Sequence, residues 1–374
     1  MRKLPPLVIG DLEIPVPIVQ GGMGVRISCS NLVSSVANYG GLGTLSAMGL
    51  CPVDTKPWDF KRVGNEELVK EIDRCREKMG DKPLALNVMV AATNWEDLVR
   101  TGAEAGVDLI VSGAGLPLKM PQVVEGTQAK IAPIISSGRA AALICRAWKK
   151  AGRYPDAIVL EGPKAGGHLG FTIAELENPR PLEELLVEVL EAIAPFEKDA
   201  GRPIPVIAAG GIYTGEDIAR LLSLGAAAAQ MGTRFVATVE CDAHDTFKDQ
   251  FVQCTEEDIV IITSPVGMPL RAIKNAWLQD IIDGERKKFK CSYKCLHTCD
   301  HRKVQYCIAD ALYRADVEGD LYGGFVICGS QTHRIKEIVP VAALMDELVQ
   351  GAEAALSGVE RLVPEADTSR VEAS

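Results

Sequence analysis

One histidine lies in a segment that is unusually rich in glycine. Residues 160–170 have the sequence LEGPKAGGHLG, and His168 is one of five histidines in the chain of 374 residues. An imidazole titrates near neutral pH, and glycine lets the backbone come close to a ligand. This combination predicts an acid–base role for His168 in a ligand-binding site. The alternative is a solvated loop histidine with no chemical role.

Two glycine motifs further along the chain are typical of a phosphate site. They are IAAGGI at 207–212 and QMGTRF at 230–235, and one predicted helix separates them. A bound phosphate needs backbone N–H groups at close range, which glycine permits, so the motifs predict a phosphate cradle. Tight turns without a ligand are the alternative. The predicted cradle residues are Gly210, Gly211, Gly232 and Thr233.

Further glycine-rich segments suit the rest of a flat ligand. QGGMG at 20–24 and SGAG at 112–115 each follow an apolar run. Small residues leave space for a planar ring, and Asn87, which is polar within an apolar strand, suits a hydrogen bond to the ligand. For Asn87 the alternative is a satisfied core amide. The predicted ligand-binding residues outside the cradle are Gly21, Gly22, Met23, Asn87, Ser112, Glu161, Gly166 and Gly167.

Four cysteines lie close together in the last third of the chain. Their spacing is Cys-x₃-Cys-x₃-Cys-x₇-Cys, and Arg and Lys residues precede them. Four thiols in so short a stretch predict an iron–sulfur cluster or a zinc ion. The alternative is a set of small buried side chains, because free cysteine packs as a small hydrophobe. The predicted metal ligands are Cys291, Cys295, Cys299 and Cys307.

The elements that must position these residues repeat along the chain. Short runs of Val, Ile, Leu and Ala alternate with amphipathic segments, which is typical of parallel strands buried on both faces. Glycine follows most of these runs, which favours an α/β fold with a (β/α)₈ TIM barrel, where every strand end faces one site. An open doubly wound sheet is the alternative. The predicted strands cover residues 14–23, 41–47, 84–90, 108–112, 131–136, 157–161, 204–209 and 227–231.

The barrel accounts for only part of the length, because such barrels commonly need about 250 residues. We therefore predict a ligand-binding barrel over residues 1–258 and a smaller C-terminal subdomain over 259–374, which contains the cysteines and caps the substrate. Within this second part the sequence predicts a strand at 259–264, a basic helical segment around Arg271 and Lys274, and a helix at 339–356.

Composition excludes several classes of function. The formal net charge is −10 and no long basic run occurs, which argues against nucleic acid or an acidic membrane surface as a partner. No apolar stretch is long enough to span a membrane, and the eleven cysteines without a signal-type segment indicate reduced thiols. We expect a cytoplasmic enzyme that acts on a small molecule, with a homodimer as one possible assembly.

Taken together, these motifs resemble one family of flavin enzymes. QGGMG, EGPKAGGHLG, IAAGGI, QMGTRF and SPVGMPLRAIKN resemble the nitronate monooxygenases, once called 2-nitropropane dioxygenases, which are related to the FMN-dependent enoyl-acyl-carrier-protein reductases. The resemblance covers residues 15–275, and EGPKAGGHLG is its most specific motif. It implies FMN, with His168 as the active-site histidine. Residues that match flavin positions are Gly22, Met23, Asn87, Gly167, Gly211, Gly232 and Thr233.

The resemblance leaves three functions open. The first, which the resemblance favours, is nitronate monooxygenase, which oxidises alkyl nitronates with oxygen. The second is a reductase that takes electrons from NAD(P)H and passes them to an enoyl thioester or another acceptor. The third is a non-catalytic electron-transfer module that combines a flavin with an iron–sulfur cluster. The histidine beside the predicted flavin favours an enzyme over the module, since a carrier of electrons needs no acid–base group.

Overall fold

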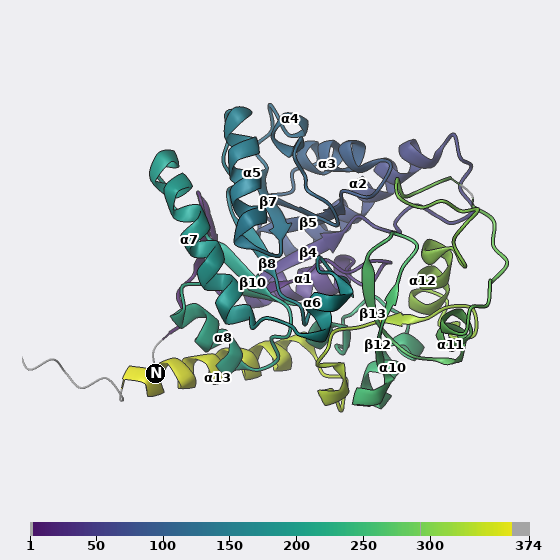
Figure 1. Ribbon diagram of the computed structural model, residues 1–374. Coiled ribbons are helices and arrows are strands. Elements are labelled where there is room, and N and C mark those ends of the chain that lie inside the picture. The colour runs from purple at the N-terminus through teal and green to yellow at the C-terminus, as the bar shows by residue number, and fades with distance from the viewer. Residues whose placement is uncertain (1–2, 292, 361–374) are drawn as a thin grey trace, which may run out of the picture.

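The computed structural model describes residues 3–291 and 293–360, and its centre is a closed barrel of parallel strands. The barrel order is β10-β11-β3-β4-β5-β6-β7-β8 (Figure 1). This confirms the predicted (β/α)₈ barrel, with strand positions close to those expected. The strands are β3 (Ile18–Gln20), β4 (Leu42–Ser46), β5 (Leu84–Met89), β6 (Leu109–Gly113), β7 (Lys130–Ile135), β8 (Ile158–Glu161), β10 (Val206–Ala209) and β11 (Ala228–Met231).

A short hairpin that the sequence analysis did not predict closes the bottom of the barrel. It consists of β1 (Leu7–Ile9) and β2 (Leu12–Ile14), which pair antiparallel. Leu7, Ile9 and Ile14 are fully buried and pack against the inward-facing side chains of the barrel strands. The hairpin therefore seals the amino-terminal end, and the opposite end remains for a ligand.

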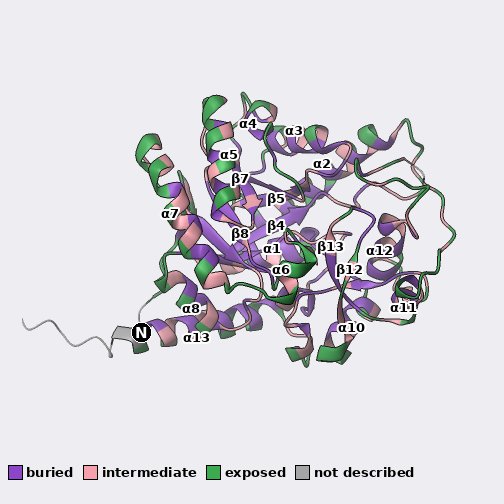
Figure 2. Cartoon of the chain, viewed as in Figure 1, coloured by how far each residue is buried: buried purple, intermediate pink, exposed green. Residues whose placement is uncertain are grey.

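Helices cover the outside of the barrel, with their buried faces turned inward (Figure 2), and the side chains on these faces are mostly apolar. This follows from the helical spacing of apolar residues, which places a stripe on one face of each helix. Ser137 caps one of these helices, since its side chain accepts a hydrogen bond from the backbone N–H of Ala140. The main outer helices are α1 (Ser30–Tyr39), α2 (Phe60–Met79), α3 (Trp95–Glu104), α5 (Gly138–Lys150), α7 (Leu182–Ala200) and α8 (Gly215–Ser223).

The segments after the barrel form a small antiparallel sheet with helices beside it. Its strands are β12 (Ile259–Thr263), β13 (Pro269–Ile273), β14 (Val326–Ile327) and β9 (Gly167–His168), the last contributed by the histidine segment. The helices are α10 (Asp245–Gln253), α11 (Ala276–Ile282) and α12 (Ile308–Asp316). In Figure 1 this sheet and α12 stand beside the barrel.

The basic segment that we predicted as helical is a strand, so that prediction was wrong. Arg271 lies in β13, whose backbone pairs with β12 on one side and with β9 and β14 on the other. The following helix, α11, begins only after Asn275, whose side chain accepts a hydrogen bond from the backbone N–H of Leu278. Pairing on both edges therefore overrides the helical character of the local sequence.

The last helix, α13 (Val341–Glu360), returns to the barrel and packs against α8 and α1. Leu344, Met345 and Leu348 are buried in the same core as the barrel helices. Residues on both sides of the predicted boundary at 258 therefore share one core. None of the helices in the described part of the chain is long and apolar enough to cross a membrane.

Candidate active site

A cavity of about 330 Å³ opens where the barrel strands end, and the C-terminal segments form its far wall. It contains His168 and nearly all of the ligand-binding residues predicted from the sequence, which belong to or follow five of the barrel strands, β3, β5, β8, β10 and β11. The predicted residues that line it are Gly21, Gly22, Met23, Asn87, Glu161, Gly166, Gly167, His168, Gly210, Gly211, Gly232 and Thr233.

His168 is held in place from the C-terminal sheet. Its backbone pairs with Leu270 of β13, and its Nε2 lies 2.9 Å from the hydroxyl oxygen of Ser264. The Ser264 hydroxyl also accepts a hydrogen bond from the backbone N–H of Val266. Burial of the imidazole lowers the pKa of His168 to about 4, so the ring is neutral at pH 7. A neutral ring keeps one nitrogen as donor and one as acceptor.

Arg271, buried in β13, fixes the loop that carries the histidine. Its guanidinium donates hydrogen bonds to the carbonyl oxygens of Pro163, at 3.0 Å, and Ala165. Both carbonyls belong to the glycine-rich loop between β8 and His168. The sequence analysis did not identify this role, because nothing local connects residue 271 with residue 163.

Glu161 ends β8 and turns toward the same cavity. Burial of its carboxyl raises the pKa of Glu161 to about 7, opposed by a hydrogen bond from the backbone N–H of Gly170 and by the nearby charge of Arg271. Near neutral pH this carboxyl is therefore partly protonated and can donate as well as accept a hydrogen bond.

The predicted phosphate cradle lies at the ends of β10 and β11. Gly211 has a φ of +84°, and an added Cβ there would lie 2.7 Å from Cβ of Lys164. Only glycine fits this position without strain. The short helix α9 (Thr233–Val236) begins directly after Gly232, and Gly232 and Thr233 at its start line the cavity. The stem of Lys164 lies over this same cradle.

The opposite side of the cavity is formed by the loop after β3. An added Cβ on Gly22 would lie 2.4 Å from Cβ of Asn87, so the two backbones are in close contact there. The buried Gln20 supports the loop: its side-chain amide donates to the hydroxyl of Ser28 at 2.8 Å, and that hydroxyl accepts from the backbone N–H of Met23. The loop shape is thus set by buried polar side chains.

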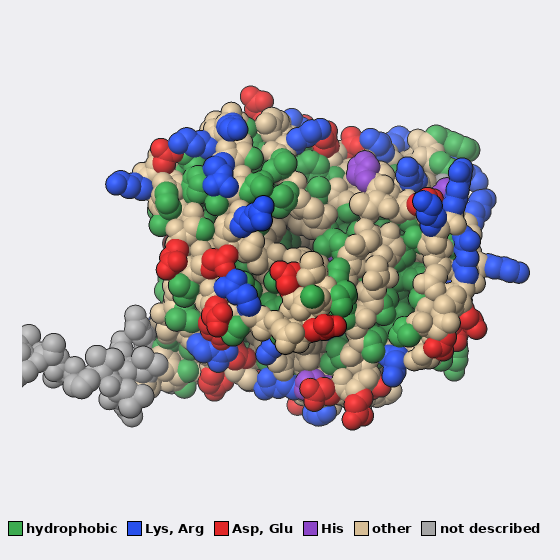
Figure 3. Space-filling model, in the orientation of Figure 1, with side chains coloured by type: hydrophobic (Ala, Val, Ile, Leu, Met, Phe, Trp, Pro, Cys, Tyr) green, Lys and Arg blue, Asp and Glu red, His purple; other side chains and the backbone are tan. Residues whose placement is uncertain are grey.

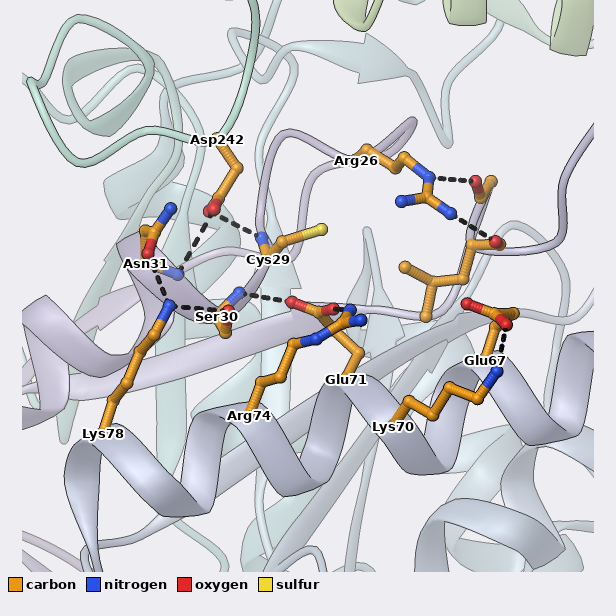
Figure 4. A network of polar contacts seen from close by, with 12 residues as sticks. Arg26, Cys29, Ser30, Asn31, Glu67, Lys70, Glu71, Arg74, Lys78 and Asp242 are labelled. Carbon is orange, nitrogen blue, oxygen red and sulfur yellow. Dashed lines mark hydrogen bonds and ion pairs between the residues drawn. The ribbon is translucent and has the colours of Figure 1, made fainter.

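A wider polar network anchors the same loop to the barrel helices (Figure 4). Asp242 accepts hydrogen bonds from the backbone N–H groups of Cys29 and Leu32 at the start of α1. Arg26 donates to the carbonyl oxygens of Gly49 and Leu50. These contacts hold both ends of the loop that carries Gly22 and Met23, so the cavity wall is fixed before any ligand binds.

Ser112 is the exception among the predicted ligand-binding residues. Ser112 is part of β6 and does not line the cavity. Its side chain is fully buried on the side of β6 that faces α3. Its hydroxyl accepts a hydrogen bond from the indole N–H of Trp95 at 2.8 Å and donates one to the carbonyl oxygen of Val88 at 2.6 Å. The O–H donor and one acceptor site of the hydroxyl are used in packing, and the side chain is not exposed to the cavity, so we do not expect it to hydrogen-bond a ligand.

The far wall is formed mostly by residues that the sequence analysis did not predict; Cys295, predicted there as a metal ligand, is one that it did. The ring of Tyr293 stacks on that of Phe60 from α2, with centroids 4.1 Å apart. Leu296 pairs through its backbone with Ala92, beside the end of β5. The residues after position 258 that line the cavity are Val266, Tyr293, Cys295, Leu296, Ile308, Ala309, Leu312, Tyr313, Ile327, Cys328, Gly329, Ser330 and Gln331. This wall is mostly apolar.

The eleven cysteines are all present as free thiols in the structure. Across residues 3–291 and 293–360, no three or more His, Cys, Asp or Glu side chains are arranged to hold one metal ion. The four clustered cysteines are each partly exposed. Cys295 is the one among them that lines the cavity.

Comparison with known proteins agrees with this geometry. The family model described as nitronate monooxygenase matches residues 6–351. FabK from Thermotoga maritima, a solved structure, has a TM-score of 0.73 and 29% identity, over 94% of this chain and 96% of that one. A probable nitronate monooxygenase of Bacillus subtilis (strain 168) is 27% identical over 287 residues, which cover 71% of this chain and 78% of that protein.

A more similar relative has a different description. It is the (3aS,4S,5R,7aS)-5-hydroxy-7a-methyl-1-oxo-octahydro-1H-indene-4-carboxyl-CoA dehydrogenase of Mycobacterium tuberculosis (strain ATCC 25618 / H37Rv). It is 31% identical over 272 residues, which cover 73% of this chain and 67% of that protein. The aligned part thus spans about two thirds of that relative. Dehydrogenase and monooxygenase relatives alike make this chain an enzyme, an oxidoreductase.

Proposed function

Since the chain belongs to the nitronate monooxygenase family, we propose that it is an FMN-dependent oxidoreductase that reduces an apolar enoyl thioester with electrons from NADH or NADPH. The observation that carries this proposal is the uncharged, largely apolar end of the cavity opposite the phosphate cradle. The acyl-CoA name of one relative and the similarity to FabK support the same substrate class.

The residues at the strand ends fit FMN. Gly211, Gly232 and Thr233 would hold the phosphate, because they line the cavity at the ends of the last two barrel strands and glycine leaves the backbone N–H groups uncovered by a side chain of its own. Gly22 and Asn87 would lie against the ring, where no larger side chain than glycine fits at position 22. When bound, FMN supplies the hydride chemistry, and the protein supplies position and electrostatics.

The charge of the cavity lining favours a neutral substrate. Within the described residues, the lining side chains with a formal charge are Glu161 and Lys164. Lys164 lies over Gly211 in the cradle, where a cation suits a phosphate. The wall formed by Leu296 and Leu312 is apolar, so it suits an acyl chain more than a small anion.

His168 would act on the thioester as a neutral hydrogen-bond donor. Its low pKa keeps the imidazole uncharged at pH 7, and the Ser264 hydroxyl 2.9 Å from Nε2 fixes the orientation of the ring. A neutral donor directed at the carbonyl oxygen stabilises negative charge that develops there during reduction. The partly protonated Glu161 is a second group in the cavity that could hold a proton.

Nitronate oxidation is the second candidate, and the family model favours it. A neutral His168 is also suited to remove the α-proton of a neutral nitroalkane. That step would place the proton on His168 and leave an imidazolium beside the anion, but a nitronate that binds already as an anion meets a neutral His168, and the cation among the described lining residues, Lys164, lies at the cradle. For this reason we place nitronate oxidation second.

An anaerobic absorbance titration of the flavin-loaded protein separates the two candidates. We expect NADPH or NADH to bleach the flavin and a medium-chain trans-2-enoyl-CoA to restore its colour without oxygen. Crotonyl-CoA, which lacks the apolar chain, serves as the matched control and should act more slowly. Bleaching by an alkyl nitronate, together with no response to either nicotinamide nucleotide, would reject the reductase in favour of nitronate oxidation.

A further inference from the structure

The segment between α11 and α12 has a charge that differs from that of the whole chain. Residues 286–303 contain seven Lys or Arg residues and one acidic residue, a formal net charge of +6, whereas the whole chain carries −10. Figure 3 shows Lys and Arg side chains gathered at the right edge of the molecule, where Figure 1 places this segment. Cations concentrated in one place on an acidic protein indicate a binding surface for an anion.

Hydrogen bonds to the backbone fold this segment back on itself. The backbone N–H of Lys287 donates to the carbonyl oxygen of Gln305 at 2.9 Å. The guanidinium of Arg286 donates to the carbonyl oxygen of Arg302 at 3.1 Å, although the two residues are 16 positions apart. The basic residues at the two ends of the segment therefore lie side by side.

These two ends line a second cavity, which has a volume of about 490 Å³. That volume lies within the range of about 300–1,000 Å³ that is usual for small-molecule sites. The lining is basic apart from one aromatic ring and one thiol. The residues that form it are Arg286, Lys287, Lys288, Phe289, Cys291, His301 and Arg302.

Two of the lining cations, Lys288 and Arg302, are available to an anion from solution. Both side chains are exposed, and among the described residues neither lies within ion-pair distance of a carboxylate. The acidic side chains nearby are paired with other cations instead. These pairs are Lys287–Asp280, Lys287–Glu285 and Lys303–Asp300. An ammonium and a guanidinium in one hollow suit phosphate groups, which a guanidinium binds through two parallel hydrogen bonds.

The basic cavity and the active-site cavity meet along this segment. Cys291 lines the basic cavity, and Tyr293 lines the active-site cavity. Two steps along the chain place their Cα atoms at most about 7.6 Å apart. The next part of the segment is fixed to the barrel, because the backbone N–H of Thr93 donates to the carbonyl oxygen of Cys295 at 3.0 Å. A long, flexible ligand that crosses this edge would have one end in each cavity.

We propose that the basic cavity binds the nucleotide of a coenzyme A thioester, an inference that rests on the proposed reduction of an enoyl thioester. This nucleotide carries three phosphate groups, which suit Lys288 and Arg302. Its adenine base has a face that can stack on an aromatic ring, and Phe289 lines the same cavity. The pantetheine arm joins the nucleotide to the thioester, so one ligand would place its acyl chain in the active-site cavity and its phosphates in the basic one.

The shape of the basic surface favours coenzyme A over an acidic carrier protein as the group that holds the acyl chain. The cations line a hollow of small-molecule size, which a nucleotide can enter. A folded carrier protein docks against a broad surface instead, since a specific protein–protein interface buries about 800 Å² on each partner. Both carriers present phosphate or carboxylate groups, so charge alone does not separate them, and the test compares the two.

Binding of the nucleotide alone tests the site without turnover. The probe is 3′-phosphoadenosine 5′-diphosphate, titrated by calorimetry into the flavin-loaded, full-length protein. We expect saturable binding that weakens as salt is added, because salt screens exposed charges. Lys288→Ala/Arg302→Ala should weaken it at least about 10-fold, since each change removes a charged hydrogen bond to phosphate. The matched control is Arg146→Ala/Lys150→Ala, an exposed pair in the last turns of α5 that removes the same charge and should leave the affinity unchanged.

Kinetics with two thioesters separate this proposal from the proposed function. An enoyl-pantetheine lacks the nucleotide, so its KM should exceed that of the enoyl-CoA at least about 10-fold in the wild type, and Lys288→Ala/Arg302→Ala should remove most of that difference. Flavin content is measured on each variant as a check that it is folded.

Three results overturn the nucleotide site: a wild type that does not bind the nucleotide, equal weakening in both double variants, or a lower KM for a carrier-protein thioester than for the enoyl-CoA. Reduction of either thioester in such a protein leaves the reductase intact. The opposite result, nucleotide binding that only Lys288→Ala/Arg302→Ala weakens in a protein that reduces neither thioester, supports the site and rejects the proposed function.

Discussion

The two sides of the cavity are built in different ways. The barrel side uses backbone at strand ends, with glycine at the closest contacts, as at Gly22 and Gly211. The C-terminal side uses side chains such as Tyr293 and Leu296, which come from a segment far along the sequence. A barrel side made of backbone suits a constant cofactor, and a wall of side chains can vary with the substrate. For this reason the cofactor is easier to infer than the substrate.

The largest expected effect is on the barrel side. Gly211→Ala should remove most of the bound flavin, because the added Cβ meets Lys164 at 2.7 Å in a backbone conformation that alanine disfavours. The measurement is the flavin-to-protein ratio after gel filtration. The matched control is Gly126→Ala, which has a similar φ of +80° but nothing within 4 Å of the added Cβ. The control should lose about 1–2 kcal/mol of stability and keep its flavin.

A full flavin content in Gly211→Ala would place the phosphate elsewhere. Loss of flavin in both variants would show that strain in the backbone, not the cradle, causes the effect. Either result would remove the distinction between the two sides of the cavity.

The next effect concerns His168, where the two sides meet. His168→Ala should lower kcat by about 10²–10⁴-fold while flavin stays bound, because an acid–base or hydrogen-bonding group is lost and the cradle is untouched. Ser264→Ala should lower kcat less, since Ser264 acts only through its hydrogen bond to Nε2. Turnover near the wild-type rate in His168→Ala would leave the histidine a structural role.

His168 also makes the stability depend on pH in a defined direction. Its folded pKa of about 4 lies below the ordinary value of 6.5, so between these values the unfolded chain binds more protons. The contribution of His168 to the free energy of unfolding is therefore complete above pH 6.5. It decreases as the pH falls toward 4, by up to about 1.4 kcal/mol per pH unit. Denaturant titrations of wild type and His168→Gln should converge as pH falls. Parallel pH curves would contradict the lowered pKa.

A smaller effect is expected on the C-terminal side. Tyr293→Ala removes the ring that stacks on Phe60 and opens the wall of the cavity. We expect KM for a medium-chain enoyl-CoA to rise about 10-fold, consistent with about 1.4 kcal/mol of lost contact, with little change for crotonyl-CoA. An equal rise for both substrates would mean that this wall does not contact the acyl chain.

The same comparison explains what could be predicted from the sequence. The strands, His168 and the glycine cradle follow from local patterns, because each needs only the residues around it. Ser264 and Arg271 do not, because they reach His168 and its loop from 96 and more than 100 positions away in the chain. β13 was predicted as a helix because pairing on both edges cannot be seen in five residues. Distance in sequence, rather than the chemistry of the residue, separates the features that the sequence analysis identified from those that it missed.

Ser112 provides the last and smallest test, because the sequence placed it with the flavin and the structure places it in packing. Its hydroxyl connects the indole of Trp95 to the carbonyl oxygen of Val88, and its exposed fraction is 0%. Ser112→Ala leaves both partners buried without it, which should lower the free energy of unfolding by about 1–3 kcal/mol. Flavin content and kcat should stay at wild-type values under conditions where the variant is folded. A stable variant that loses flavin would return Ser112 to the binding site and show that the barrel side reaches deeper than the cavity lining indicates.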